Sequence, residues 1–138
     1  MPHRTDVPIT WGDTDAGGLI YYPRLFHFFV VALNDYFTPV ADHLMEQLRA
    51  DGYVLPVVET SASFTTPLRA GDTARIETAI EVGERSLTAT FTVTREADGR
   101  RAAEGRAVFI LVDADFEPTP LPASVRRCVE DRESSATS

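Results

Sequence analysis

The sequence predicts an α+β fold in which one long helix packs against an antiparallel sheet. Two patterns support this class. Apolar residues recur at the spacing of one helical face between Tyr22 and Phe37, and in the second half of the chain they alternate with polar residues. A helical segment followed by strands indicates two packed layers around one core.

The first strand is expected at residues 6–11, and a turn-rich cluster at 12–18 follows it. Pro23 suits the first turn of the long helix, because a proline there forfeits no helical hydrogen bond. Pro39 is expected to end this helix. A second, shorter helix is then expected from Val40 to about Arg49.

The second half of the chain alternates with the two-residue period of strands. Strands are expected in the order of a meander, at residues 54–66, 74–82, 87–94 and 103–112. Such alternation is typical of an antiparallel sheet with one packed face and one wetter face. The long helix is apolar around much of its circumference, as expected if the sheet curls round it.

Length and composition fit one globular domain. The chain has 138 residues, of which 43% are hydrophobic, and this allows a single packed core. We expect the domain at residues 1–127 and a polar, disordered tail at 128–138. A lone cysteine, Cys128, rules out an internal disulfide and fits a reducing compartment.

The charge and the hydropathy of the chain argue against several classes of partner. A net charge of −8 disfavours nucleic acid, whose phosphates require clustered Lys and Arg. No apolar run approaches the roughly 20 residues of a membrane span. The N-terminal segment lacks the apolar core of a signal peptide, so we expect a cytoplasmic protein.

The most distinctive segment is residues 11–23, where two carboxylates and three glycines precede an aromatic-rich helix. A capping turn is one interpretation, since Asp and Gly are common in turns and at helix starts. A calcium loop fails because its last ligand position falls on Arg24, where a bidentate Glu is required. A phosphate-binding loop fails because no Gly-Lys-Ser/Thr ending is present.

Hydrolysis of a thioester is a further interpretation of this segment. It requires a base or nucleophile beside the carbonyl carbon and hydrogen-bond donors aimed at the developing oxyanion. A loop carboxylate and the unpaired N–H groups of a first helical turn supply both. Because Pro23 has no N–H, the foremost donor would be Tyr22.

The segment resembles the opening signature of the 4-hydroxybenzoyl-CoA thioesterase family, in Gly12-Asp13-Thr14-Asp15, in Gly18-Leu19-Ile20-Tyr21-Tyr22-Pro23 and in the aromatic helix that follows. Weaker matches continue to about residue 127, at Pro56-Val57-Val58-Glu59, Phe64-Thr65-Thr66-Pro67, Leu68-Arg69-Ala70-Gly71-Asp72, Val82-Gly83-Glu84-Arg85-Ser86-Leu87 and Ala103-Glu104-Gly105. The resemblance implies a hot-dog fold, in which a five-stranded antiparallel sheet wraps a long central helix. It also implies a homodimer or homotetramer that hydrolyses acyl-CoA or aryl-CoA, with no metal and with no cofactor apart from the CoA of the substrate.

The resemblance further implies roles for individual residues. The family's aspartate falls on Asp15, as nucleophile or general base, and its backbone donor to the thioester carbonyl falls on Tyr22. The CoA phosphates would meet Arg85 beside Ser86, with Arg69 as a second choice. The remaining substrate-binding residues are expected in the loop and helix and, from the partner subunit, on the strand after the second helix: Gly18, Tyr21, Pro23, Phe26, Glu59 and Ser61.

Two other functions stay open at this point. A dehydratase or hydratase of the same fold would use a helix histidine, for which His27 is the candidate. A non-catalytic hot-dog protein would only bind an acyl group. The Asp15 motif speaks against both, since neither function needs it. The sequence does not specify the acyl group, and it does not decide between CoA and an acyl carrier protein as the thiol.

Overall fold

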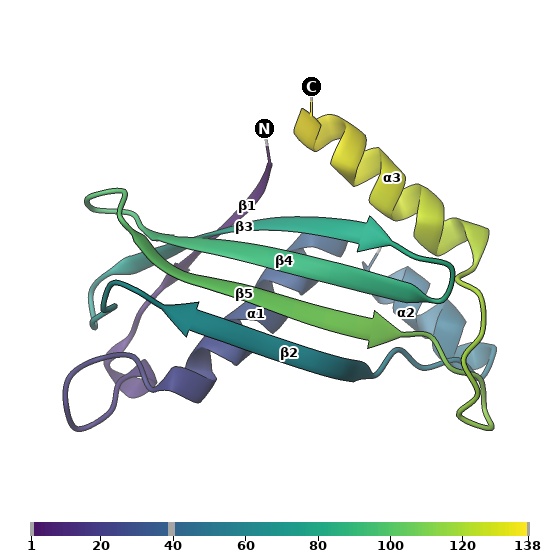
Figure 1. Ribbon diagram of the computed structural model, residues 1–138, viewed down its shortest axis with the longest axis horizontal. Coiled ribbons are helices and arrows are strands. Elements are labelled where there is room, and N and C mark those ends of the chain that lie inside the picture. Colours follow the sequence, from purple (N-terminus) through teal and green to yellow (C-terminus); the bar gives the residue numbers. More distant parts are fainter. Residues whose placement is uncertain (1, 39–40, 138) are drawn as a thin grey trace.

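The computed structural model describes residues 2–38 and 41–137. One antiparallel sheet dominates the molecule, and the long helix crosses one of its faces (Figure 1). The α+β class and the five-stranded sheet predicted from the sequence are confirmed. The strands are β1 (His3–Pro8), β2 (Val57–Phe64), β3 (Thr73–Val82), β4 (Ser86–Arg95) and β5 (Arg101–Ile110).

The long helix α1 spans Tyr22–Phe37, as the apolar periodicity predicts. A second helix, α2, spans Ala41–Ala50. The predicted break at Pro39 and the predicted helix start at Val40 lie outside the described residues. No helix within residues 2–38 and 41–137 is both long and apolar enough to cross a membrane.

The sheet order is β1-β3-β4-β5-β2, so the prediction of a four-strand meander is wrong. Of the last four strands, only β3, β4 and β5 are consecutive both in the sequence and in the sheet. β2 pairs with β5 and occupies one edge, while β1 takes the place beside β3. Alternation fixes which face a side chain occupies but carries no information about which strand lies alongside.

The first strand begins and ends earlier than the expected 6–11. Residues Trp11–Asp13 form a short 3₁₀ turn, η1. Asp13 accepts hydrogen bonds from both the N–H and the hydroxyl of Thr10, at 2.9 Å each, and these bonds bend the chain out of the strand.

The C-terminal segment is a helix rather than a disordered tail. Helix α3 spans Ala123–Thr137 and buries Val125 and Val129, which are spaced four residues apart. The Glu133 carboxylate accepts hydrogen bonds from the Tyr36 hydroxyl (3.0 Å) and the Ile80 N–H (2.9 Å). The tail prediction was wrong because a narrow apolar stripe is easily missed in a polar sequence.

The core centres on aromatic packing between α1 and the sheet. The Phe29 ring stacks on Phe91 with centroids 4.2 Å apart and planes at 3°. The same ring lies over Gly105, where a Cβ would come within 2.2 Å of it. A backbone without a side chain at this point allows the helix to approach β5 closely.

Candidate active site

The segment between η1 and α1 folds back on itself as a closed loop. Thr14 and Ile20 pair across its base. Inside it the Asp15 N–H donates to the Leu19 carbonyl at 2.9 Å, and the Gly18 N–H donates to the Asp15 carbonyl at 3.0 Å. Gly18 has φ of 80°, a left-handed conformation that favours glycine. The loop therefore holds the Asp15 backbone in a defined position.

Of the two aspartates in this segment, Asp13 and Asp15, the first is held by contacts with its neighbours. It is 5% exposed, and besides its bonds to Thr10 it accepts a 2.7 Å hydrogen bond from the Arg24 guanidinium. Burial alone would raise the pKa of Asp13. The hydrogen bonds from Thr10 and the Arg24 charge outweigh burial, so the pKa lies below its ordinary value. Because these contacts occupy both of its oxygens, Asp13 has a local structural role.

Asp15 is the free carboxylate. Its side chain is exposed, and its Oδ1 accepts one hydrogen bond, from the Gly17 N–H at 2.9 Å. Within the described part of the chain, Oδ2 has no partner and no ion pair engages the group. One oxygen is thus oriented by the loop, and the other is available to a water molecule or a substrate.

The start of α1 supplies an unpaired backbone donor close to the same loop. Tyr21 is the N-cap residue, and its N–H donates to the Asp13 carbonyl at 2.9 Å. The next N–H, that of Tyr22, makes no hydrogen bond with any described residue. Pro23 has no N–H, and the Arg24 N–H donates to the Tyr21 carbonyl. The helix dipole favours negative charge at this position.

Several predicted binding residues lie around this loop. Leu19 pairs with Arg69 in an isolated bridge, so the β2–β3 connection runs alongside the loop. Tyr21 and Tyr22 are 53% and 65% exposed, respectively. Phe26 is half-buried and packs edge-on against Phe29. Gly18, Tyr21, Pro23, Phe26 and Arg69 therefore lie on the loop, on the first turns of α1 and on the connection beside them.

The predicted residues on β2 occupy a sheet edge. β2 pairs with β5 only, and the exposed Glu59 accepts a 2.7 Å hydrogen bond from Arg106. Ser61 is exposed two residues further on. Three large apolar side chains on the same strand are also exposed: Val57, Val58 and Phe64. An unpaired edge with exposed apolar residues is a ready surface for another strand.

The predicted phosphate-binding pair is not brought to Asp15 within one chain. Arg85 and Ser86 lie at the β3–β4 turn, beyond the C-terminal end of β3. The Asp15 loop lies near the other end, where Ile9 donates to the Asp72 carbonyl just before β3 begins. A ten-residue strand separates the two ends by roughly 33 Å.

His27 and Cys128, two further candidates, lie in no catalytic arrangement with the side chains that the structure describes. His27 is exposed on α1, and the centroid of its ring lies 6.4 Å from that of the Phe28 ring. Burial raises the pKa of the Cys128 thiol, which makes it a poor nucleophile. Of the side chains that the structure describes, no three acidic, histidine or cysteine groups converge on a point that could hold a metal ion.

An apolar cavity of about 210 Å³ lies between the second half of α1, α2, the sheet and α3. Its lining is apolar except for Asn34, and includes Val30, Leu33, Phe37, Leu55, Phe109 and Val125. This cavity could not be predicted from the sequence, because its walls come from separate elements whose neighbours are set by the strand order.

Residues 9–129 match the sequence pattern of the thioesterase-like superfamily. The chain belongs to that superfamily. The resemblance to the 4-hydroxybenzoyl-CoA thioesterase family is thereby confirmed, and so is the hot-dog fold.

Three relatives illustrate the match. The 1,4-dihydroxy-2-naphthoyl-CoA hydrolase of Thermosynechococcus vestitus is 26% identical over 129 residues, covering 89% of this chain and 88% of that protein. A gentisyl-coenzyme A thioesterase of solved structure is 26% identical, with a TM-score of 0.74 over 89% of this chain and 98% of the other. A 1,4-dihydroxy-2-naphthoyl-CoA thioesterase from Synechocystis, at 15% identity, has a TM-score of 0.85 over 96% and 98% of the two chains. All three relatives are named as thioesterases or CoA hydrolases, and this confirms the prediction of a thioester hydrolase.

Proposed function

We propose that this thioesterase-like protein hydrolyses an acyl-CoA or aryl-CoA thioester to the free acid and CoA, with Asp15 as the nucleophile or general base. The observation that carries the proposal is that the loop and the helix start directly after it each supply a free group. The Asp15 carboxylate has an oxygen without a partner, and the N–H of Tyr22 at the helix start is unpaired. Acyl transfer to water uses this combination.

Two routes fit these groups. In one, an Asp15 oxygen attacks the thioester carbon, the C–S bond breaks and CoA leaves as the thiolate, which takes a proton from water. A second water then cleaves the acyl–aspartate anhydride to the free acid and regenerates the carboxylate. In the other, Asp15 takes a proton from a water that attacks the carbon directly, the C–S bond breaks, and the departing CoA sulfur receives a proton. In both routes the N–H of Tyr22 donates to the carbonyl oxygen as negative charge develops on it.

The proposed active unit is a homodimer, or a homotetramer built from it. The exposed apolar edge of β2 supports this, because an uncovered edge strand with Val57, Val58 and Phe64 is costly in a monomer. A partner paired along β2 would bring its own Glu59 and Ser61 near the interface. Arg85 and Ser86, remote from Asp15 within one chain, would act across such an interface if they act at all.

The acyl group is proposed to be aromatic or medium-chain aliphatic. The relatives described above are named for dihydroxynaphthoyl-CoA and gentisyl-CoA, which are aromatic thioesters. Tyr21 and Tyr22, at the start of α1, have exposed rings, which suit stacking against an aryl group. CoA is favoured over an acyl carrier protein because a chain with a net charge of −8 repels an acidic protein.

The test is release of free thiol from a panel of aromatic and aliphatic acyl-CoA thioesters, measured with a thiol-reactive dye. Turnover of at least one aromatic or medium-chain thioester supports the proposal. Conversion of 3-hydroxyacyl-CoA to enoyl-CoA without thiol release would instead indicate the dehydratase alternative with His27. Binding without any turnover would indicate an acyl-binding protein.

A further inference from the structure

The turn at residues 113–117, between β5 and α3, holds an aromatic ring in solvent on a strained backbone. Phe116 is 72% exposed, and its φ of 61° lies in the left-handed region. Among the residues that the structure describes, it is the one residue other than glycine with a positive φ. A bulky side chain strains the backbone in this conformation, and such strain is concentrated at functional positions.

Hydrogen bonds fix the conformation of this turn. The Asp113 Oδ1 atom accepts from the N–H groups of Asp115 and Glu117, at 2.9 and 3.0 Å. The Phe116 N–H donates to the Asp113 carbonyl, and the Asp113 N–H donates to the Glu117 carbonyl, at 3.0 Å each. The Phe116 ring is therefore presented on a fixed support, as expected of an aromatic anchor in a protein interface.

The turn and the loop of the candidate active site lie at opposite ends of the open edge of the sheet. Val54 pairs with Val112 shortly before β2 begins, and the turn follows Val112. Leu19 pairs with Arg69 shortly after β2 ends. Both segments project past β2 on its open side, the loop in purple and the turn in yellow-green (Figure 1). The eight residues of β2 separate them by roughly 26 Å, so the Phe116 ring cannot reach the loop of its own chain.

Exposed apolar side chains are present at both ends of this edge. They are Val54 and Val57 at the end with the turn, and Trp11, Leu19, Tyr21 and Phe64 at the end with the loop. In a two-fold dimer, each contact between two different patches occurs twice. Antiparallel pairing of the two β2 strands lays the turn end of each copy against the loop end of the other. This arrangement covers both groups of apolar side chains at once.

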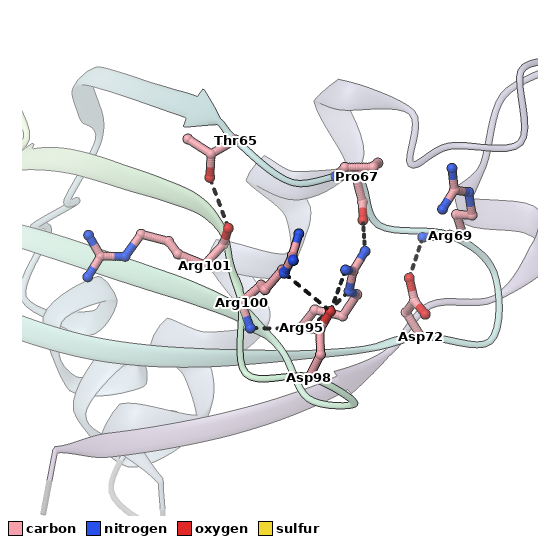
Figure 2. A network of polar contacts seen from close by, with 8 residues as sticks. All are labelled: Thr65, Pro67, Arg69, Asp72, Arg95, Asp98, Arg100 and Arg101. Atoms are coloured by element: carbon pink, nitrogen blue, oxygen red, sulfur yellow. Dashed lines mark hydrogen bonds and ion pairs between the residues drawn. The ribbon is translucent and has the colours of Figure 1, made fainter.

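The loop end is already fixed within a single chain. The Arg95 guanidinium donates to the Pro67 carbonyl at 3.0 Å, and the Thr65 hydroxyl donates to the Arg101 carbonyl at 2.9 Å (Figure 2). These bonds tie the β2–β3 connection, which runs beside the loop, to the β4–β5 hairpin. A surface held in place before association loses little conformational freedom on binding, and this favours pairing of two copies.

We infer that Phe116 of the partner subunit lies against the Asp15 loop and forms one wall of the acyl site. The inference rests on the homodimer and the activity proposed above. Each dimer then has two equivalent sites, with Asp15 and Tyr22 from one chain and the aromatic wall from the other. The ring packs against an aryl or apolar acyl group and helps to exclude water from it.

Mixed dimers test whether Phe116 acts across the interface. Phe116→Ala is expected to lower kcat/KM for benzoyl-CoA about tenfold, because it removes an aromatic contact with the acyl group. A dimer with Phe116→Ala in one chain and Asp15→Asn in the other, isolated through a different tag on each chain, has one site with both residues intact. We expect about half of the wild-type kcat/KM, against about one twentieth if Phe116 acted within its own chain.

Tyr22→Ala provides the matched control, because Tyr22 and Asp15 serve the same site from the same chain. A mixed dimer of Tyr22→Ala with Asp15→Asn has no intact site. We therefore expect its kcat/KM to stay at about half of the value for the Tyr22→Ala dimer.

A second readout needs no turnover. Chains with Phe116→Cys and with Leu19→Cys, each also carrying Cys128→Ser, are mixed and treated with a bismaleimide cross-linker. We expect a covalent dimer of the two different chains. The control replaces Leu19→Cys by Glu130→Cys, on the exposed face of α3, and should give no such product.

Four results would each overturn the inference: a chain that is monomeric in solution, a wild-type kcat/KM in Phe116→Ala, a mixed Phe116→Ala and Asp15→Asn dimer at about half of the Phe116→Ala value, or cross-linking at Leu19 no greater than at Glu130. A chain that gives the expected cross-link but hydrolyses no thioester would contradict the proposed function and leave the placement of Phe116 intact.

Discussion

The guanidinium of Arg24 donates to the buried carboxylate of Asp13 at 2.7 Å, and this contact separates the two aspartates of the loop into different roles. Asp13 joins the start of α1 to the 3₁₀ turn before it, because it is also bonded to Thr10. Asp15, two residues later, is left with a free oxygen.

Alanine variants of the two aspartates are expected to differ in stability, because only Asp13 is held by buried contacts. We expect Asp13→Ala to lower the free energy of unfolding by about 1–3 kcal/mol, since it removes the hydrogen bonds that Thr10 and Arg24 donate to a buried carboxylate. Asp15→Ala is expected to change it by less than about 0.5 kcal/mol, as is usual for an exposed position. Urea denaturation of both variants and the wild type measures this difference. Equal stability of the two variants would contradict the assignment of Asp13.

The lowered pKa of Asp13 predicts a pH-dependent contribution to stability. Because the pKa of the folded state lies below that of the unfolded state, the contribution is fully present above the ordinary Asp pKa of about 3.9 and is lost as the pH falls through the folded pKa. Asp13→Asn should lack this part of the acid sensitivity. Urea denaturation between about pH 6 and pH 3 gives the slopes.

Other carboxylates, Asp98 among them, also lose stabilising contacts in acid. The informative quantity is therefore the difference between the wild type and Asp13→Asn at each pH. A difference that stays constant down to the lowest pH would show that Asp13 is not ionised preferentially in the folded state.

The backbone donor at the helix start can be removed without removing the helix. Tyr22 is the first residue of α1, a position where proline is tolerated, and Tyr21 has φ −67° and ψ 117°, which a following proline accepts. Tyr22→Pro deletes the N–H proposed to hold the oxyanion. We expect kcat to fall by about 10²–10³.

Tyr22→Ala is the matched control, because it removes the ring and keeps the N–H. It should alter KM more than kcat if the ring serves only in binding. A similar fall in kcat for the proline and alanine variants would assign the effect to the ring and would refute the oxyanion role of the N–H.

Glu133 fastens the C-terminal helix to the rest of the fold through Tyr36 and Ile80. Glu133→Ala leaves a buried hydroxyl and a strand N–H without an acceptor, so we expect a loss of about 1–3 kcal/mol in the free energy of unfolding. Glu130→Ala, on the exposed face of α3, is the control and should change stability by less than about 0.5 kcal/mol. Thermal unfolding followed by circular dichroism compares the two, and equal melting temperatures would show that α3 is held by its apolar residues alone.

The features predicted correctly from the sequence are those that depend on residues close together in the chain. The helix at Tyr22–Phe37 was predicted with its bounds because a 3.6-residue apolar period is a property of neighbouring residues. The alternation of β3 and β4 was predictable for the same reason. The loop around Asp15 was recognisable because its Asp, Gly and Pro residues each have a narrow conformational role.

The features that were missed depend on contacts between distant segments. β2 lies beside β5 rather than β3, and nothing in the alternation of either strand specifies that partner. Helix α3 is held by Glu133, whose hydrogen-bond partners are 53 and 97 residues away in sequence. The separation of Arg85 from Asp15 follows from the strand order and could not be foreseen without it.

The most direct measurement is the rate of thiol release by Asp15→Asn with the best acyl-CoA substrate of the wild type. The asparagine preserves the size of the side chain and its hydrogen bond from Gly17, but it provides neither a base nor a nucleophile. The account predicts a fall in kcat of at least about 10²-fold with an unchanged melting temperature. A variant that retains turnover within about twofold of the wild type would contradict it, since the reaction would then proceed without the carboxylate.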